Sequence, residues 1–400
     1  MESSGSSAAV SGKFLVNTAA MPLTLGLAFV AFTTQFGGGF ASGAQIYQYF
    51  INYGVWCLIL PAFTQGLYAL FFWYGMRYAH AHKAYDYRTF SDVFYGKYRS
   101  VFSNLFEICY LIMIGTASSA AFATGASTIS TLMGWDYGIC TVIIAAFIFL
   151  IVMFGTGMVR SAASTLSVLI LAGLVAVLVP NILSGSGMIA DSIAGMNAGA
   201  LPVLAAPDAR PDFGAALWMA FLYFLFQLPS VSVMYQHVAA VTDKKQIDKA
   251  GLWIFFCNFF AMELSILGLL AVSFRPELVG ASVPMLILVQ NGVGGSILTP
   301  LISVLIILGA ISTGTNMIAG IVARCVNAVE RRLPEAKRDH GHLGRNAVFA
   351  VCFTFAAFAI SQFGLMAIVR QGYKYLGYAG FITLFVPFVI HMIVTRGKDI

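Results

Sequence analysis

The sequence predicts an all-α integral membrane fold of ten transmembrane helices, of which the first and the sixth are broken. Composition gives the first reason: 59% of the 400 residues are hydrophobic and only 10% are charged, whereas soluble domains average about 45–50% apolar and about 25% charged residues. The other two reasons are the number of long apolar runs and the placement of basic residues between them. Because a spanning helix needs about 20 apolar residues, ten spans with their loops leave little room for a separate soluble domain.

The domain organisation follows from where the apolar runs begin. Residues 1–13 are rich in serine and lack the basic start of a secretory signal, so we expect a disordered cytoplasmic tail there and a single transmembrane domain over residues 14–396. The runs are continuous rather than alternating, which excludes a β-barrel. The ten predicted spans lie near residues 21–52, 55–79, 101–132, 138–156, 161–180, 213–241, 250–274, 296–326, 346–363 and 373–395.

Basic residues lie almost entirely on one side of these spans. Lys and Arg concentrate in cytoplasmic loops; with the N-terminus inside, eighteen of the 22 lie inside, and only Arg210, Arg275, Arg370 and Lys374 lie outside. This bias supports ten spans with both termini in the cytoplasm, in a plasma membrane such as the bacterial inner membrane. The basic loops carry no aromatic and basic recognition motif, so we expect the lipid bilayer and a small solute as partners, and no nucleic acid.

The first span is interrupted by FTTQFGGGFASG, which places Gly37, Gly38 and Gly39 in the middle of the membrane. Each glycine weakens a helix by about 1 kcal/mol relative to alanine, and unpaired backbone groups cannot face lipid. The break must therefore lie inside the protein or line a cavity. A kink that serves only close helix packing is the alternative.

The sixth span contains a second helix breaker, Pro229 in YFLFQLPSVSV, where proline removes a backbone donor and crowds the preceding turn. A shift of the chain by 192 residues aligns five residues of the two spans along one helix stripe, ending with Gln35 on Gln227. Five spans separate the two breaks, so the two halves have opposite orientations in the membrane. This pattern is typical of inverted-repeat transporters, with repeats over about residues 21–180 and 213–395.

A broken helix can hold a solute directly. The half-helix after the glycines points free N–H groups and its positive end at an anion, while unwound carbonyls can coordinate a cation. The two glutamines before the breaks can read polar groups, and three phenylalanines can line an apolar part of the site. The candidate substrate-binding residues are Gln35, Gly37, Gly38, Gly39, Phe40, Phe122, Phe226, Gln227, Ser230 and Asn316.

Adjacent hydroxyls on the eighth span suggest a cation site. Ser312 and Thr313 lie near the midplane in ILGAISTGTNMIAG, and hydroxyl oxygens with the carbonyls of Thr33 and Phe36 from the first break can form a sodium site. The alternative is that both hydroxyls bond back to their own helix.

Two acids lie within the predicted spans, Glu107 and Glu263. An ionisable residue at the bilayer centre costs on the order of 3 kcal/mol or more, which makes it a functional candidate. Glu263 lies midway along its span and is a candidate proton site. Glu107 lies near the cytoplasmic edge, where solvation explains it, and neither acid has an obvious basic partner at similar depth.

The segment FGGGFASGAQIYQYF resembles the YkvI-type amino acid permease family, within the amino acid, polyamine and organocation transporter superfamily. The Ser-Thr-Gly of the eighth span and YKYLGYAGF near the last span extend the resemblance. It implies a LeuT-type five-plus-five fold with substrate between spans one, three, six and eight. It also implies that the Thr33 and Phe36 carbonyls, with Ser312 and Thr313, match the widespread sodium site. Gln35 and Gly38 depart from the family pattern, which indicates a substrate other than a simple aliphatic amino acid.

These features together predict a secondary active transporter and not an enzyme. We expect alternating access, with spans one, two, six and seven rocking against the rest, to move a small polar or zwitterionic solute, an amino acid or a derivative. Sodium is the expected coupling ion and no cofactor is needed. The alternatives are a proton-coupled transporter or exporter that uses Glu263, an intramembrane enzyme and a channel; the sequence assigns neither a substrate nor an oligomeric state.

Overall fold

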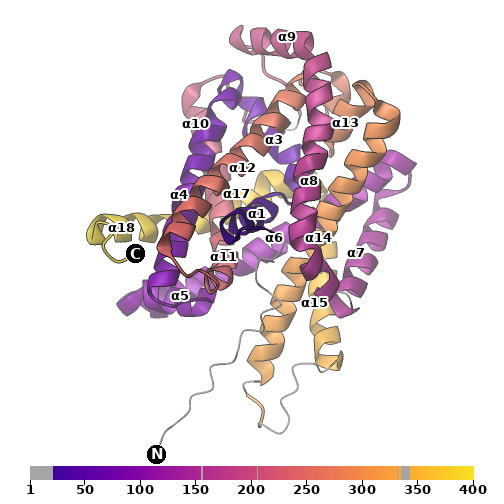
Figure 1. Ribbon diagram of the computed structural model, residues 1–400. Helices are drawn as coiled ribbons and strands as arrows, with labels where there is room; N and C mark the ends of the chain where they lie inside the picture. Colours follow the sequence, from indigo (N-terminus) through magenta and orange to yellow (C-terminus); the bar gives the residue numbers. More distant parts are fainter. Residues whose placement is uncertain (1–20, 155, 205, 331, 335–342) are drawn as a thin grey trace, which may run out of the picture.

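The computed structural model describes residues 21–154, 156–204, 206–330, 332–334 and 343–400, with backbone alone for 156–167. The predicted tail of residues 1–13 lies outside this part of the chain. The described residues fold into a bundle of helices without strands (Figure 1), which confirms the all-α fold class.

The first span is broken as predicted. Helix α1 (Leu23–Gln35) ends at the break, and the short helices α2 (Gly38–Ala41) and α3 (Ala44–Tyr49) continue the span. Between α1 and α2, Gly37 is extended, with ψ of −179°. Gly43, between α2 and α3, has φ of +84°, a left-handed conformation that glycine adopts at no steric cost.

The sixth span is tightened rather than unwound. Helix α10 (Phe213–Gln227) passes into a 3₁₀ turn, η5 (Leu228–Ser230), and then into α11 (Val231–Val238), and the whole forms one span of 26 residues. Pro229 lies in the first turn of η5, where its missing amide is not needed. The sequence therefore located the irregularity correctly but overestimated how far it opens the helix.

The remaining predicted spans are also helical. Among the described residues, seven helices are long and apolar enough to cross a membrane, the sixth span included, or up to eight if α8 and α9, which meet at 76°, form one bent span. This is the pattern of a multi-pass membrane protein. The helices that make up the remaining predicted spans, counted as membrane helices or not, are α4 (Leu60–Ala81), α6 (Arg99–Met133), α7 (Tyr137–Phe154), α8 (Thr156–Ser184), α9 (Ser186–Asn197), α12 (Lys244–Leu270), α14 (Gly295–Glu330), α15 (Leu343–Ser361), α16 (Leu365–Ala367), α17 (Tyr373–Gly380) and α18 (Val386–Thr395), with π-helical segments η8 (Ile368–Gly372) and η9 (Phe381–Phe385) in the last span.

Short helices cap the two ends of the bundle. Helix α5 (Tyr87–Phe94) lies at one end, and α9 lies at the other (Figure 1); we call these ends the α5 side and the α9 side. The other short elements are η2 (Ile51–Tyr53), η3 (Val55–Leu58), η4 (Gly96–Tyr98), η6 (Pro276–Leu278) and α13 (Pro284–Asn291). Helix α13 contacts the first break, because the Met285 amide donates to the Ser42 carbonyl at 3.0 Å.

The long helices form two packed groups. Helix α12 packs against α1 and α4, and α4 also packs against α10 and α11. In the second group α6, α7, α14 and α15 pack on one another around a separate core that includes Phe122 and Ile148. Helix α8 contacts members of both groups. The first group contains the spans that we expect to rock, so the proposed moving unit is a packed unit.

Candidate transport site

A cavity of about 440 Å³ lies between α1, α11, α14 and the chain just before α5; we call it the inner cavity. It brings together residues that are almost 300 positions apart in the sequence. Its lining includes all four predicted sodium ligands and one predicted substrate residue: Thr33, Phe36, Ser312, Thr313 and Asn316.

The backbone break faces this cavity with unusual hydrogen bonding. The Gly37 amide donates to the Gln35 carbonyl at 2.8 Å, and the Phe40 amide donates to the Gly37 carbonyl at 3.1 Å. In a continuous helix these amides would bond to Thr33 and Phe36. The break thus diverts the amides that would otherwise occupy the two carbonyls predicted to hold a cation.

The hydroxyl pair of α14 lies next to the break. A β-carbon built on Gly37 would stand 3.7 Å from the Thr313 hydroxyl oxygen. Within the described part of the chain, neither Ser312 nor Thr313 makes a side-chain hydrogen bond. Thr33 behaves differently, since its hydroxyl donates to the Phe29 carbonyl at 2.9 Å. The two α14 hydroxyls are therefore not bonded back to their own helix.

A buried polar chain crosses the centre of the protein. The Gln35 amide donates to the Tyr223 hydroxyl, and that hydroxyl donates to Gln45 Oε1. The donor–acceptor distance is 3.4 Å in both hydrogen bonds. The Tyr223 ring packs against Phe226 with centroids 4.8 Å apart, and Phe226 stacks on Tyr373 at 4.6 Å. These side chains are buried and line neither cavity. We call them, together with Tyr49 and Phe40, the central layer.

The glycines of the break are held by close packing. A β-carbon on Gly38 would stand 2.5 Å from the Thr124 hydroxyl oxygen and 3.1 Å from the Ala120 carbonyl oxygen, and one on Gly39 would stand 2.7 Å from the Gln45 amide nitrogen. In this conformation Thr124 and Gln45 fill the space where we expected a ligand to approach. Gly37 is less crowded, since a β-carbon there would meet only Thr313 at 3.7 Å, and it directly follows Phe36, which lines the inner cavity.

Some predicted site residues lie elsewhere. Phe122 is buried in the core between α6, α7 and α14, away from Phe40 and Phe226. The Ser230 hydroxyl donates to the Gln227 carbonyl at 2.5 Å, while the Gln227 side chain lies near Tyr223. Glu263 lines neither cavity, and its buried Oε1 has no hydrogen-bond partner among the described residues.

Glu107 has the basic partner that the sequence did not reveal. Arg324 of α14 forms an ion pair with it, and the Tyr87 hydroxyl donates to Glu107 Oε2 at 2.9 Å. The Arg324 guanidinium lies over the Tyr87 ring, 4.2 Å from its centroid. The prediction that solvation alone explains Glu107 was wrong, because helix packing brings together residues 217 positions apart.

Sequence reasoning also missed Tyr223, Gln45 and Thr124. Tyr223 is four residues before Gln227, so both lie on one helix face, and this spacing could have drawn attention to it. Gln45 follows the glycine break by two turns. Thr124 carries no such signal, since its role depends on which face of α6 meets α2.

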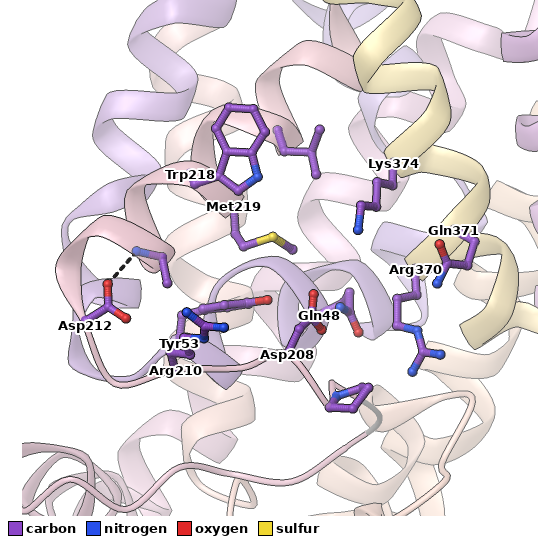
Figure 2. A pocket seen from close by; sticks show the side chains of 13 residues that line it. Gln48, Tyr53, Asp208, Arg210, Asp212, Trp218, Met219, Arg370, Gln371 and Lys374 are labelled. Carbon is purple, nitrogen blue, oxygen red and sulfur yellow. Dashed lines mark hydrogen bonds between the residues drawn. The ribbon is translucent and has the colours of Figure 1, made fainter.

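A second cavity of about 420 Å³ lies beside the chain that joins α9 to α10, and Figure 2 shows the side chains that line it; we call it the outer cleft. It lies between the chain after α3, the start of α10, and η8 with α17. Its lining includes the charged residues Asp208, Arg210, Asp212, Arg370 and Lys374.

Solved structures of similar fold are membrane transporters. A Na⁺-coupled sialic acid symporter in a substrate-bound, outward-open state is 13% identical, with 96% of this chain covering 80% of that chain at a TM-score of 0.59. An Eremococcus coleocola manganese transporter mutant is 15% identical (92% of this chain, 86% of that chain, TM-score 0.44). Mhp1, a nucleobase-cation-symport-1 family transporter, is 14% identical (90% and 71%, TM-score 0.42).

The first of these likenesses shows the LeuT-type fold. No protein-family model matches the chain, and no curated protein matches it. The resemblance to YkvI-type permeases therefore stays a prediction.

Proposed function

We propose that the protein is a secondary active transporter that moves a small polar or zwitterionic solute, an amino acid or a derivative, by alternating access coupled to sodium. One observation carries this proposal: the broken first span and the hydroxyl pair of α14 border the same cavity. Unwound carbonyls and hydroxyls are the ligands that LeuT-type folds offer to sodium. The likeness to a Na⁺-coupled symporter supports the fold class of this mechanism.

The composition of the central layer supports the proposal that the solute is polar. Gln35 Oε1 is buried without a hydrogen-bond partner among the described residues, and an unsatisfied buried acceptor costs about 1–3 kcal/mol. A solute with an ammonium or hydroxyl group would supply the missing donor once the layer opens. Because no charged side chain belongs to the central layer, the solute would bring its own charges.

The closed central layer supports a mechanism of alternating access rather than an open channel. Solute in the inner cavity meets buried aromatic rings before it can reach the outer cleft. Rocking of α1, α4, α10, α11 and α12 against the second helix group would open the layer on one side at a time. We favour a transporter over an intramembrane enzyme because the two side chains of the inner cavity that could act as a base, Asp86 and His237, form no hydrogen bond with a hydroxyl that lines it among the described residues. An enzyme would need a nucleophile paired with a base.

We place the α5 side in the cytoplasm of a plasma membrane. Eighteen of the 22 basic residues are predicted on that side, as cytoplasmic loops require. With this orientation the inner cavity faces inward, and both chain ends lie inside.

The proposed function is tested by thermal stabilisation of the purified protein with a library of amino acids and related zwitterions, in sodium and in potassium. We expect at least one solute to raise the unfolding temperature more in sodium, and the same solute to accumulate in proteoliposomes under a sodium gradient. If no solute stabilises the protein under either cation and none accumulates, the transporter proposal fails.

The sodium site has its own test. Replacing both Ser312 and Thr313 with alanine should abolish the sodium dependence of uptake. Ser303→Ala is the matched control, because Ser303 lies on the same helix and its hydroxyl donates to the Thr299 carbonyl at 2.6 Å, away from the cavity. Uptake by the double variant that still depends on sodium would show that the site is elsewhere.

Proton coupling through Glu263 is the second candidate, favoured by its unpartnered buried oxygen. In that case Glu263→Gln should remove the pH dependence of transport while Glu277→Gln, in the loop after α12, keeps it. Unchanged pH dependence in Glu263→Gln would exclude this role.

A further inference from the structure

The outer cleft concentrates charge on the α9 side. Three of the four basic residues predicted there, Arg210, Arg370 and Lys374, line this one cavity. The fourth, Arg275, instead donates to Asn291 at 3.0 Å. Three outer basic residues in one cleft are more than orientation in the membrane requires.

The charges are divided between two walls. Figure 2 shows Arg370, Gln371 and Lys374 on the last span, drawn in yellow, and Asp212 with Arg210 across the cleft. Asp208 lies on the chain that leads to α10. Trp218 and Met219 lie between the walls, and the Trp218 side chain is 47% exposed. The wall with Lys374 thus suits a carboxylate. On the other side Asp212 caps α10 by accepting the Ala215 amide at 2.7 Å, which leaves Asp208 as the carboxylate for an ammonium group.

A buried amide at the floor lacks a partner. Gln48 lines the cleft, is 1% exposed, and has an Oε1 atom with no hydrogen bond among the described residues. An acceptor in this position needs an N–H or O–H donor. This observation is independent of the charges and indicates a ligand with such a donor.

The cationic wall is built on an irregular helix turn. Arg370 and Gln371 lie in the π-helical segment η8, and π turns frequently mark functional sites because they shift side chains out of α-helical register. The Tyr49 hydroxyl donates to the Val369 carbonyl of this turn at 2.9 Å, and the Tyr49 ring packs on Tyr223 with centroids 5.7 Å apart. The cleft wall is therefore in contact with the central layer.

We propose that the outer cleft is a docking site for a zwitterionic solute of the amino acid class, entered before the central layer opens. The carboxylate lies against Lys374, and the ammonium group reaches Asp208 and Gln48 Oε1. Trp218 covers the apolar part of the solute. This inference rests on the proposed function and adds a second binding site to it.

The fluorescence of Trp218 can report binding in this cleft. Purified full-length protein is titrated with the proteinogenic L-amino acids, one at a time at millimolar concentration, while tryptophan fluorescence is recorded. We expect at least one amino acid to give a saturable change that is lost in Trp218→Phe. Trp135→Phe removes an exposed tryptophan outside the cleft and should keep the change.

Charge variants test the two walls separately. Lys374→Gln should raise the Kd of the fluorescence change about tenfold, as expected for a lost bond to a charged group, and raise the KM of uptake without lowering its maximal rate. Lys374→Arg and Arg275→Gln should leave both unchanged. Asp208→Asn should weaken the binding of amino acids to the cleft. It should not weaken the binding of acetate, measured by its competition with the amino acid, because acetate has no ammonium group.

A fluorescence change that survives both Trp218→Phe and Lys374→Gln overturns the docking site, as does the absence of any change with every amino acid. If uptake and thermal stabilisation persist in either case, the transporter proposal stands without it. If neither uptake nor stabilisation occurs with any solute, the proposed function itself fails.

Discussion

The inner cavity and the outer cleft have nearly the same volume, about 440 and 420 Å³, but opposite chemistry. The outer cleft is lined by five charged side chains. The inner cavity is lined by hydroxyls, amides and aromatic rings, with Asp86 as its one acidic side chain among the described residues. Asp86 is occupied, because it caps helix α5 through the amides of Arg88 and Thr89.

This difference follows from depth in the membrane. A fixed charge near the bilayer centre costs about 3 kcal/mol, whereas an exposed charge at the rim stays hydrated. A site at the midplane that binds a charged ion or solute therefore uses neutral oxygens, which cost less to keep when the site is empty. A site at the rim can contain fixed charges at little cost in free energy, and these charges attract solute from a distance.

Placing a fixed charge in the inner cavity should reduce stability and uptake more than any other change that tests this difference between the cavities. Thr313→Lys puts an ammonium group beside the break, where it would compete with sodium; we expect a cost of about 3 kcal/mol and about a hundredfold loss of uptake. Gln371→Lys adds the same charge to the outer cleft and should change stability by less than about 0.5 kcal/mol. Equal losses in the two variants, measured by thermal unfolding and proteoliposome uptake, would contradict the comparison.

The close packing of α2 against α6 should be the next most sensitive feature. Gly38→Ala forces a β-carbon to within 2.5 Å of Thr124, and overpacking of this kind costs about 1–3 kcal/mol. Gly37→Ala is the control, since its β-carbon would meet Thr313 at an ordinary 3.7 Å. Unfolding in detergent micelles should separate the two variants. Equal stability would mean that α2 can move away from α6 at no cost.

The ion pair at the α5 side should have a smaller effect. Glu107 and Arg324 are each about one quarter exposed, so we expect a value between exposed and buried pairs, about 1–2 kcal/mol for Glu107→Gln or Arg324→Gln alone. The double variant should be less destabilised than the sum of the two single variants, because it leaves no unpaired charge. Strict additivity in this cycle would show that the pair is not coupled.

The sequence predicted the fold and the inner cavity better than the central layer. The glycine break and the Ser312–Thr313 pair could be found because their signals are local: a run of glycines and two adjacent hydroxyls at midplane depth. That the break and the hydroxyl pair would lie together was implied by the resemblance to LeuT-type transporters, and Thr33, Phe36, Ser312 and Thr313 do line one cavity. Pro229 was also a local signal, but a 3₁₀ turn satisfied its missing donor without unwinding the helix.

What could not be predicted depends on which helix faces meet. Arg324 looked like an ordinary basic residue at a span end until packing placed it on Glu107. Thr124 was one of many small residues on its span until α2 packed against it. The outer cleft joins segments near residues 48, 210 and 372 that share no pattern in the sequence. Hydrophobic runs identify spans, but they do not encode pairings across 150 or more residues.

The smallest expected effect is that of salt, which should weaken solute binding at the outer cleft more than binding at the inner cavity. The Debye length is about 8 Å at physiological ionic strength and about 3 Å at 1 M, so salt screens Lys374 and Arg370 in the hydrated cleft but hardly reaches oxygens behind the central layer. With sodium held constant and choline chloride added, we expect the KM of uptake to rise about two- to threefold, since exposed ion pairs contribute at most about 1 kcal/mol. Lys374→Gln should reduce this rise, whereas Ser303→Ala should keep it. A salt effect of equal size in Lys374→Gln would mean that the cleft charges do not act on the solute, and that the contrast between the cavities concerns hydration alone.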